Sequence, residues 1–171
     1  WHRLKPAFIN SYTNECYGTQ AKPAVPFGAW LVRAIPRQRE KLDAKFRYLP
    51  KPTPGQKLLD IGCGNGSFLE LARSAGWDVM GIDPDPAAID AAKLRGLQVA
   101  AGSIQLYEGM SHCFDAITLS HVIEHLHEPV QVIQAVHRLL KPGGTLFVDT
   151  PNIDSNGARL WGRNWRGLET P

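Results

Sequence analysis

The sequence predicts a doubly wound α/β fold, in which helices pack around a mostly parallel sheet. From residue 57 onward, short apolar runs alternate with amphipathic stretches of helical period, and this alternation is typical of parallel βαβ units. The first apolar run leads directly into a cluster of glycines, and the second is followed by Asp83. Both features are expected at the sheet edge where such folds bind their ligands.

Five strands are expected, each a short apolar run bounded by turn residues: Lys57–Ile61, Trp77–Ile82, Leu97–Ala101, Phe114–Leu119 and Thr145–Asp149. Three helices are expected between them: Ser67–Ala75 with Gly76 after its last turn, a helix from Pro86 to a stop at Gly96, and Pro129–Leu140. Asp85 is placed to cap the second helix. A short loop over 102–113 replaces a further crossover helix, and Pro142-Gly143-Gly144 ends the third helix.

The chain divides into two expected regions. Residues 1–50 form an N-terminal segment that is irregular to about residue 26 and then helical over 27–48, with an interruption at Pro36. A short stiff linker, Lys51–Gly55, leads into a core that comprises 51–171. The last part of this core, 151–171, is expected to be loop with one short helix.

Composition limits the class of protein. Hydrophobic residues make up 43% of the 171 residues and charged residues 20%, which is ordinary for a globular domain. No apolar run approaches the roughly 20 residues that a membrane span needs, and the N-terminus has no signal-peptide pattern. Cys16, Cys63 and Cys113 are odd in number and widely spaced, so neither a disulfide framework nor a zinc motif is expected. We therefore expect a cytoplasmic protein.

Charge is distributed unevenly along the chain. Residues 1–57 hold 11 Lys and Arg against 3 Asp and Glu, although the net charge of the whole chain is only +3. Such a basic segment can attract an anionic substrate or a nucleic acid. The charges over residues 37–45 are mixed in sign and lack interleaved aromatic residues, so a solvated helix is the favoured interpretation.

The glycine turn, Leu58-Leu59-Asp60-Ile61-Gly62-Cys63-Gly64-Asn65-Gly66-Ser67, predicts a nucleoside cofactor. Closely spaced glycines let the backbone approach a ligand, and the helix that follows offers free N–H groups. Asp83 lies 23 residues after Asp60, where a doubly wound fold places the carboxylate that accepts hydrogen bonds from a ribose.

The spacing of the glycines distinguishes between cofactors. A dinucleotide fingerprint, G-x-G-x-x-G, would need a third glycine at the position of Ser67. Here the pattern is D-x-G-x-G-x-G, and the carboxylate of Asp60 would repel a pyrophosphate. S-adenosylmethionine has a cationic amino-acid end, a sulfonium and no phosphate. It is therefore the expected cofactor, with S-adenosylhomocysteine as its product.

A family resemblance becomes clear at this point. Residues from about 57 to 168 resemble the class I S-adenosylmethionine-dependent methyltransferases, in particular a broad subgroup with an S-H-V-I-E-H-L segment after the fourth strand. Four segments carry the resemblance: Leu58–Gly66, Gly81-Ile82-Asp83, Phe114–Leu126 and Leu139–Thr150. The resemblance implies a Rossmann-like sheet of order 3-2-1-4-5, with strands 6 and 7 missing. It also implies that the N-terminal segment covers the substrate side.

The resemblance also assigns roles at the matching positions. Asp60 and the glycines would border the methionine end of the cofactor, and Asp83 would hold the ribose. Pro84 and Gly102-Ser103-Ile104 would flank the adenine, although many relatives have an acid where this chain has Ser103. The expected cofactor-binding set is Asp60, Gly62, Gly64, Gly66, Asp83, Pro84, Gly102, Ser103, Ile104 and Ser120.

His121, Glu124 and His125 are the expected catalytic residues, because they lie just past the fourth strand. One of the two histidines would serve as general base or substrate contact, and Glu124 would orient it. The H-x-x-E-H spacing also occurs in an inverted zinc-protease motif, but that motif requires a helix. Metal-assisted methyltransferases resemble the segment with E-x-x-E-H. His121 replaces their first acid and leaves a poor match to magnesium, so no metal is expected. A purely structural role, in which Glu124 and His125 cap and pack the loop, stays open.

The expected function is transfer of a methyl group to a small-molecule acceptor, by O-methylation of a sugar, lipid or quinone precursor. The alternatives are a cofactor-binding domain that is inactive as truncated, and a metal-assisted RNA 2′-O-methyltransferase. Nucleic acid as a partner is supported only by the basic segment. An uncovered fifth strand would expose unpaired N–H and C=O groups, so self-association through this edge is expected.

Overall fold

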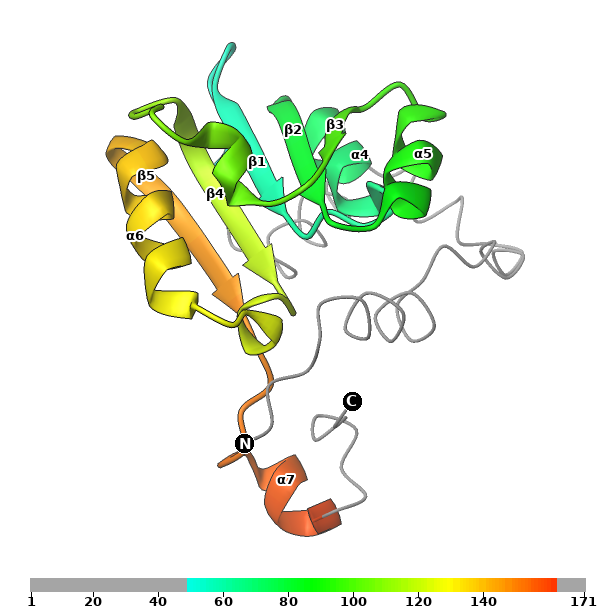
Figure 1. Ribbon diagram of the computed structural model, residues 1–171, viewed down its shortest axis with the longest axis vertical. Helices are drawn as coiled ribbons and strands as arrows, with labels where there is room; N and C mark the ends of the chain where they lie inside the picture. Colours follow the sequence, from blue (N-terminus) through cyan, green and yellow to red (C-terminus); the bar gives the residue numbers. More distant parts are fainter. Residues whose placement is uncertain (1–48, 163–171) are drawn as a thin grey trace.

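Five parallel strands form one sheet in the order β3-β2-β1-β4-β5. The computed structural model describes residues 49–162. The strands are β1 (Lys57–Ile61), β2 (Asp78–Asp83), β3 (Gln98–Ala101), β4 (Phe114–Ser120) and β5 (Leu140–Asp149). The predicted fold class and strand order are therefore confirmed, and all strand ends point toward the same edge of the sheet (Figure 1).

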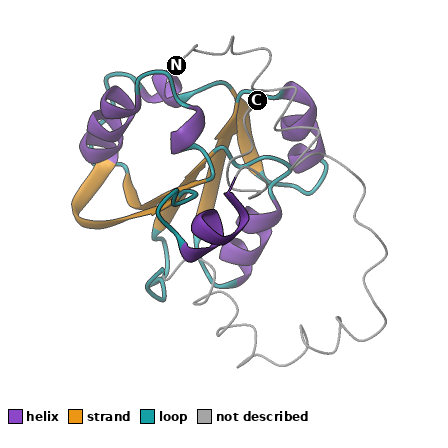
Figure 2. Ribbon diagram, turned by 90° about the horizontal axis from the view of Figure 1, so that it is seen from below, coloured by secondary structure: helices purple, strands orange, loops and turns teal. Residues whose placement is uncertain are grey.

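Helices flank the strands on both sides (Figure 2). They are α4 (Ser67–Ser74), α5 (Pro86–Lys93), α6 (Pro129–Leu139) and the short α7 (Asn156–Trp161), with 3₁₀ helices η1 (Ile104–Tyr107) and η2 (Ile123–His125). The predicted cap of α5 is confirmed, because the Asp85 carboxylate accepts hydrogen bonds from the backbone N–H groups of Ala87 and Ala88. Gly76 follows α4 with a φ of +106°, as its predicted role requires.

The core consists of two layers, one on each face of the sheet. Leu58 of β1 packs with Leu69 of α4 and Ile89 of α5. The next residue, Leu59, belongs to the opposite layer, together with Val136 and Leu139 of α6. This alternation follows from the period of two along a strand. Within residues 49–162, the helices α4, α5 and α6 therefore pack on the two faces of the sheet.

The start of β5 differs from the sequence prediction. The strand begins at Leu140, beside Phe114, whereas it was expected at Thr145. Thr145 pairs with Ala116, so the Pro142-Gly143-Gly144 run forms an irregularity inside the strand. Glycine and proline break the ladder here without ending the strand, because the pairing with β4 resumes after the extra residues. The prediction missed this since the same residues are also typical of a loop.

Smaller differences concern the ends of other elements. β2 is displaced by one residue from its predicted range, and β4 extends by one residue, to Ser120. The predicted loop 102–113 contains η1. The N-terminal segment, residues 1–50, lies almost wholly outside the described residues, as does the tail after Gly162. Within residues 49–162, no helix has the length and apolar character needed to cross a lipid bilayer.

Candidate functional site

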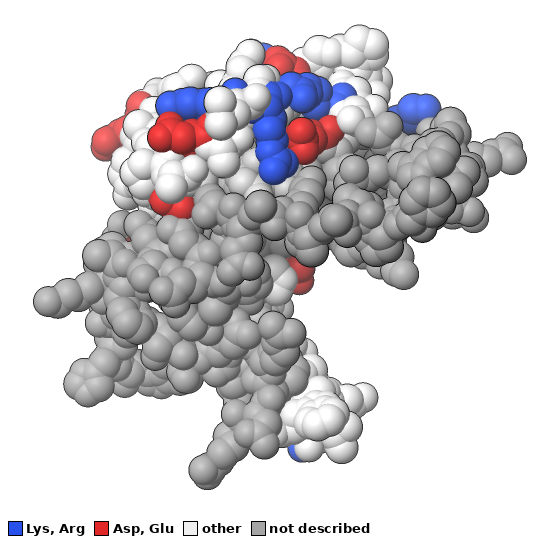
Figure 3. Space-filling view, turned by 90° about the vertical axis from the view of Figure 1, so that its right-hand side faces the viewer, with Lys and Arg blue, Asp and Glu red and all other residues white. Residues whose placement is uncertain are grey.

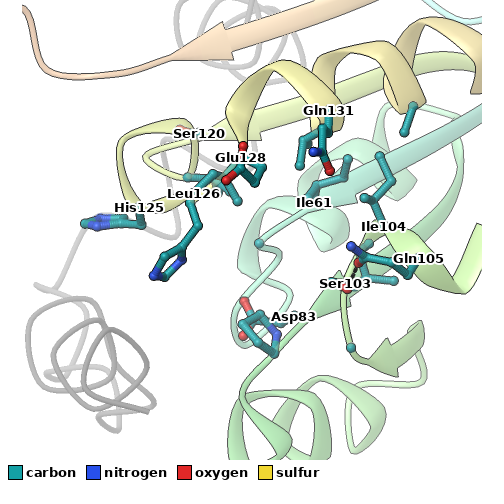
Figure 4. Close-up of a pocket in the computed structure, with 18 of the residues that line it drawn as sticks. Ile61, Asp83, Ser103, Ile104, Gln105, Ser120, His125, Leu126, Glu128 and Gln131 are labelled. Carbon is teal, nitrogen blue, oxygen red and sulfur yellow. Dashed lines mark hydrogen bonds between the residues drawn. The ribbon is translucent and has the colours of Figure 1, made fainter. Parts of the chain in front are cut away.

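A cavity of about 940 Å³ opens at the carboxyl edge of the sheet. Its walls come from the loops that follow β1, β2, β3 and β4 and from one side of α6. In Figure 4, His125 and Gln105 lie at opposite sides of the view, with Asp83 below and Gln131 above. Open α/β sheets bind ligands at this edge, and the volume lies within the range of roughly 300–1,000 Å³ that small-molecule sites occupy.

The glycine loop after β1 forms the floor of the cavity with its backbone. Gly62 and Gly64 line the cavity, and both have positive φ angles, of +75° and +52°. A Cβ on Gly62 would lie 2.3 Å from Cγ2 of Val122, whereas a Cβ on Gly64 would meet no atom within 4 Å. Gly62 is therefore required by packing, and Gly64 leaves open space on the cavity side.

Gly66 has a different task. It is the N-cap of α4 with a φ of +76°, and a Cβ there would lie 2.2 Å from Cδ1 of Leu97. It does not line the cavity. Because Gly66 has no side chain, α4 can begin in contact with Leu97, the residue that precedes β3. Gly66 therefore shapes the loop by packing.

Asp83 ties the glycine loop to the end of β2. Its Oδ2 accepts the N–H of Gly64 at 2.8 Å, and its Oδ1 accepts the N–H of Asp85 at 2.9 Å. Burial raises the pKa of this carboxyl above its usual value, and the two backbone donors only partly offset the effect. A carboxylate has about four lone-pair sites, so Asp83 can still accept hydrogen bonds from a diol in the cavity.

Asp60 lies behind the loop and does not line the cavity. The residue is 1% exposed, and its Oδ1 accepts a hydrogen bond from Oγ1 of Thr118 at 2.5 Å. The structure therefore separates the two acids that the sequence paired: Asp83 faces the ligand space, and Asp60 acts from beneath the loop. Its charge still disfavours a pyrophosphate on the loop, because it is buried close to that backbone.

The residues expected at an adenine also lie in the cavity wall. Pro84, Gly102, Ser103 and Ile104 all line the cavity. The side chains of Ser103 and Gln105 are hydrogen-bonded to each other (Figure 4). Gln105 thus brings an amide beside the position where many relatives have an acid.

His121 lies between two carboxylates. Its Nδ1 is 3.5 Å from Oε1 of Glu124, and its Nε2 is 3.6 Å from Oδ2 of Asp149. The backbone N–H of His121 donates to the carbonyl of Asp149 at 2.8 Å, and its φ of +54° is unusual for a residue other than glycine. Asp149, at the end of β5, therefore lies beside the expected catalytic residues, all of which come from the segment after β4.

Glu124 is itself held by β5. Its Oε2 accepts a hydrogen bond from Oγ1 of Thr150 at 3.2 Å, and its side chain is 23% exposed. Glu124 does not line the cavity, whereas His121 and His125 do. The carboxylate is therefore placed to orient His121, which is the role that the sequence predicts for it.

The cavity brings together most of the expected site and adds residues that the sequence analysis missed. Of the expected residues, those that line it are Gly62, Gly64, Asp83, Pro84, Gly102, Ser103, Ile104, Ser120, His121 and His125. The additional lining residues include Asn65, Gln105 and Glu108, and a stripe of α6 at helical spacing: Gln131, Gln134, Ala135 and Arg138. Asp149 was missed although it ends a strand, as Asp83 does. That shared position was the available signal.

The local structure of the H-x-x-E-H segment differs from that of a zinc-protease motif. Among residues 49–162, no group of three or more His, Cys, Asp and Glu side chains is arranged to hold a metal ion. The H-x-x-E-H segment forms a single 3₁₀ turn over Ile123–His125, and His121 precedes that turn. It therefore lacks the continuous α-helix that would present two histidines on one face, as the zinc-protease motif needs.

The residues present fit an adenosyl cofactor without phosphates. The glycine loop offers close backbone approach, and Asp83 offers a carboxylate at the end of β2. A positively charged amino-acid end suits a loop with buried acidic charge beneath it, whereas a pyrophosphate does not. The chemistry of these donors and acceptors thus favours the cofactor expected from the sequence.

Comparisons with known proteins support this interpretation. Residues 34–171 match a family model described as a methyltransferase domain. A ubiquinone biosynthesis O-methyltransferase from Pseudomonas aeruginosa is 39% identical over 105 residues, which cover 57% of this chain and 45% of that protein. The chain therefore spans about half the length of the curated relatives it matches.

Solved structures show the same fold. A SAM-dependent methyltransferase from Archaeoglobus fulgidus superposes with a TM-score of 0.63 at 22% identity, over 91% of this chain and 63% of that one. A phosphoethanolamine N-methyltransferase from Haemonchus contortus, solved with S-adenosylhomocysteine, has a TM-score of 0.58 at 22% identity, over 84% of this chain and 32% of that one. The sheet order, the cavity and the family match lead to one conclusion: the chain belongs to the class I S-adenosylmethionine-dependent methyltransferases.

Proposed function

We propose that this protein transfers a methyl group from S-adenosylmethionine to a hydroxyl group of a small molecule. The observation that carries the proposal is the position of His121, which lines the cofactor cavity and lies beside two carboxylates. A histidine in this place is suited to take the proton of a hydroxyl. The relatives named as O-methyltransferases support the same reaction class.

The cofactor supplies an activated methyl group on a sulfonium, so the protein has little covalent chemistry to perform. The chain's own residues orient the reactants. The glycine loop and Asp83 bind the cofactor, and His121 and His125 border the space for the acceptor. Orientation of this kind can account for about 7–11 kcal/mol of the barrier. A general base adds on the order of 10²–10⁴-fold in rate when the acceptor is a hydroxyl.

A hydroxylated quinone precursor is the acceptor class that we propose. Its support is the name of the relatives, ubiquinone biosynthesis O-methyltransferase. A nucleic-acid acceptor is less well supported, because on the described surface the cations are mixed with acids. Figure 3 shows this mixture on one face. Among the described residues, Arg95 pairs with Glu70 at 2.9 Å. The basic segment over residues 1–57 lies largely outside the described residues.

We further propose a cytoplasmic location and self-association through β5. Cys63 and Cys113 are free thiols, which suits a reducing compartment. Among the described strands β5 pairs with β4 alone, and the proposed self-association uses the other edge of β5.

A methyl-transfer assay tests the proposed reaction. The full-length protein is incubated with S-adenosylmethionine and a panel of phenols, catechols, sugars and short RNAs, and formation of S-adenosylhomocysteine is measured. Methylation of the phenol or catechol hydroxyls is expected. Transfer only to RNA, or transfer that stops with a chelator and returns with Mg²⁺, would contradict the proposal.

The variant His121→Ala tests the role of the imidazole. Turnover should fall by roughly 10²-fold or more, since the base is lost. The affinity for S-adenosylhomocysteine, measured by calorimetry, should stay within about threefold of the parent value, because the change spares cofactor binding. Loss of cofactor binding would instead show that the His121 side chain is needed to bind the cofactor, and would contradict its role as the base alone.

A further inference from the structure

We propose that Gln105, held by the hydroxyl of Ser103, recognises the base of the cofactor through two hydrogen bonds. Because an amide both donates and accepts, the site then binds a base that carries an oxo group nearly as well as adenine with its amine. This inference rests on the proposed function and deepens its cofactor site. It makes Gln105 a specificity-determining residue and Ser103 a positioning residue.

The order of the strands determines where the base would lie. β1 and β3 lie on opposite sides of β2 in the sheet. With the amino-acid end of the cofactor over the glycine loop after β1 and the ribose at Asp83 after β2, the base extends away from β1. It therefore reaches the loop after β3, and this loop brings Gln105 into the cavity wall.

The loop after β3 is anchored to the end of β2. The N–H of Gly102 donates to the carbonyl of Asp83 at 2.9 Å. Ile104 is 7% exposed and belongs to the core layer on the α6 side of the sheet. Its two neighbours, Ser103 and Gln105, are exposed and line the cavity. The backbone of this loop is therefore fixed relative to Asp83, and its two polar side chains are accessible to a ligand.

The Ser103 hydroxyl bonds to Gln105 in place of the backbone. Ser103 is the N-cap residue of η1, where a serine oxygen ordinarily accepts a hydrogen bond from a backbone N–H. Here the side chain makes no such cap. The hydroxyl instead donates to Oε1 of Gln105 (Figure 4). This contact orients the amide at the cavity wall, so less conformational freedom is lost when a ligand binds.

The groups that Gln105 offers to a ligand match adenine. Its Oε1 has a second lone pair, and its Nε2 carries two N–H groups. Adenine presents an amine donor next to a ring nitrogen that accepts, and a glutamine amide can bond to such a pair at once. The cavity wall therefore offers the base one acceptor and one donor.

A carboxylate in this place would have a narrower preference. An ionised acid only accepts hydrogen bonds, so it suits the amine of adenine and repels the oxo group of hypoxanthine. A glutamine amide can turn by half a rotation, after which Nε2 donates to the oxo group and Oε1 accepts from the ring N–H. The Ser103 hydroxyl supports both orientations, because it donates to Oε1 or accepts from Nε2. Gln105 therefore tolerates either base.

Titration calorimetry on the full-length protein tests the inference, with S-adenosylhomocysteine and S-inosylhomocysteine as probes. The second probe carries hypoxanthine in place of adenine and is otherwise the same. Gln105→Glu keeps the shape and leaves only acceptors, and Gln105→Leu removes both kinds of group. Gln98→Glu makes the same charge change at an exposed glutamine of β3 that does not line the cavity.

The expected affinities separate the role of the amide from the effect of an added charge. The parent protein and Gln98→Glu should bind the two probes with affinities within about tenfold of each other. Gln105→Glu should bind S-adenosylhomocysteine about as tightly as the parent. It should bind S-inosylhomocysteine about tenfold or more weakly than the parent, since two acceptors then face each other. Gln105→Leu should lose about tenfold or more in affinity for both probes.

The variants Ser103→Ala and Ser103→Thr test the positioning role, because one removes the hydroxyl and the other keeps it. Ser103→Ala should weaken binding of both probes by about threefold to tenfold, since the amide is no longer held. Ser103→Thr should restore the parent affinities. The melting temperatures should match that of the parent, because the contact joins two exposed side chains. Equal affinities in Ser103→Ala and the parent would overturn the positioning role.

Two failures can be told apart. The inference is overturned and the proposed function stands if the parent binds S-adenosylhomocysteine and Gln105→Leu binds it equally well. The same holds if Gln105→Glu leaves the ratio of the two affinities unchanged, or if the parent prefers adenine by more than about tenfold. If the parent binds S-adenosylhomocysteine but methylates no hydroxyl acceptor, the proposed function is overturned, and the affinities still decide the role of Gln105.

Discussion

At the scale of single residues, Asp83 links the fold to ligand binding. Its two oxygens already accept the N–H groups of Gly64 and Asp85, so it shapes the loop and faces the cavity at once. Asp60, which the sequence places at the methionine end of the cofactor, is instead buried against Thr118 and does not line the cavity. We therefore expect Asp83 to bind the ligand directly and Asp60 to act on the ligand only through the loop.

The variant Asp83→Asn should weaken binding of S-adenosylhomocysteine by about 1.5–3 kcal/mol, because hydrogen bonds to a charged acceptor have this value. That corresponds to a loss of roughly 10- to 150-fold in affinity, measured by titration calorimetry. The melting temperature gives the control, since it shows whether the loop still folds. An unchanged affinity in a folded variant would remove Asp83 from the ribose role.

The raised pKa of Asp83 also predicts a pH dependence. Burial makes this carboxyl take up its proton at a higher pH than an ordinary aspartate. As the pH falls through that raised pKa, the charged acceptor is lost and the affinity for S-adenosylhomocysteine should decrease. Calorimetry between about pH 4 and 7 checks this dependence, and in Asp83→Asn the dependence should be absent.

The same shift has a defined sign for stability. Because the folded-state pKa lies above the unfolded value, the folded protein binds the proton more tightly between the two pKa values. The contribution of Asp83 to the free energy of unfolding therefore decreases as the pH rises through this window. Replacement by Asn should remove this decrease, and urea unfolding of the parent and the variant at several pH values across the window measures it.

At the scale of elements, the two glycines of the loop between β1 and α4 should respond differently to replacement by alanine. Gly62→Ala should lower the stability of the fold by about 1–3 kcal/mol, because its Cβ would overlap Val122 at a positive φ. Gly64→Ala has open space around its Cβ and costs only backbone strain. That space belongs to the cavity, so Gly64→Ala should mainly weaken cofactor binding.

Thermal melts and calorimetry on the two glycine variants separate these effects. The expected pattern is a lower melting temperature for Gly62→Ala and a weaker affinity with a nearly parental melting temperature for Gly64→Ala. If both variants lost the same stability, the overlap with Val122 at Gly62 would not explain the loss.

A second element-scale prediction concerns the amino ends of β1, β4 and β5. Oδ2 of Asp115 accepts from Nζ of Lys141 at 2.7 Å and from the N–H of Lys57 at 2.8 Å. Desolvation acts to raise the pKa of this carboxyl, but these two donors outweigh it and hold the pKa below its usual value. Its stabilising contribution is therefore present above the unfolded pKa and is lost as the pH falls through the folded one.

Asp115→Asn should lower the free energy of unfolding by about 1 kcal/mol at neutral pH, since the pair is partly exposed. Urea unfolding at pH 7 and at the lowest pH where the fold persists measures the effect. The difference from the parent should shrink at the lower pH. A difference that stays constant with pH would assign the loss to packing.

How far the sequence determines these elements depends on whether the signal is local. Asp85, Pro86 and the glycine turn predict their elements correctly, because capping and positive φ are decided within a few residues. The start of β5 could not be predicted, since Leu140 joins the sheet through pairing with Phe114. The Asp149–His121 contact was missed for the same reason: it depends on the spatial order of β4 and β5.

At the scale of the whole molecule, β5 is an edge strand that the described residues leave open. It ends the sheet next to β4, and Leu146 and Val148 on it are 37% and 38% exposed. An edge with apolar side chains favours pairing with another chain. Light scattering on this chain should therefore report a mass above that of a monomer.

The variant Val148→Lys tests the edge, because a lysine on an edge strand disfavours strand pairing. It should shift the light-scattering mass toward the monomer, and Val130→Lys, a change at an exposed position on α6, should leave the mass unchanged. A parent chain that is monomeric at high concentration would contradict self-association through β5.

The central claim is that the cavity above the glycine loop accepts a phosphate-free adenosyl cofactor. Titration calorimetry with S-adenosylhomocysteine and, separately, with NAD tests it most directly. We expect a saturable heat with S-adenosylhomocysteine, a much weaker one in Asp83→Asn, and none with NAD. Binding of NAD in place of S-adenosylhomocysteine would contradict the claim and the catalytic roles built on it.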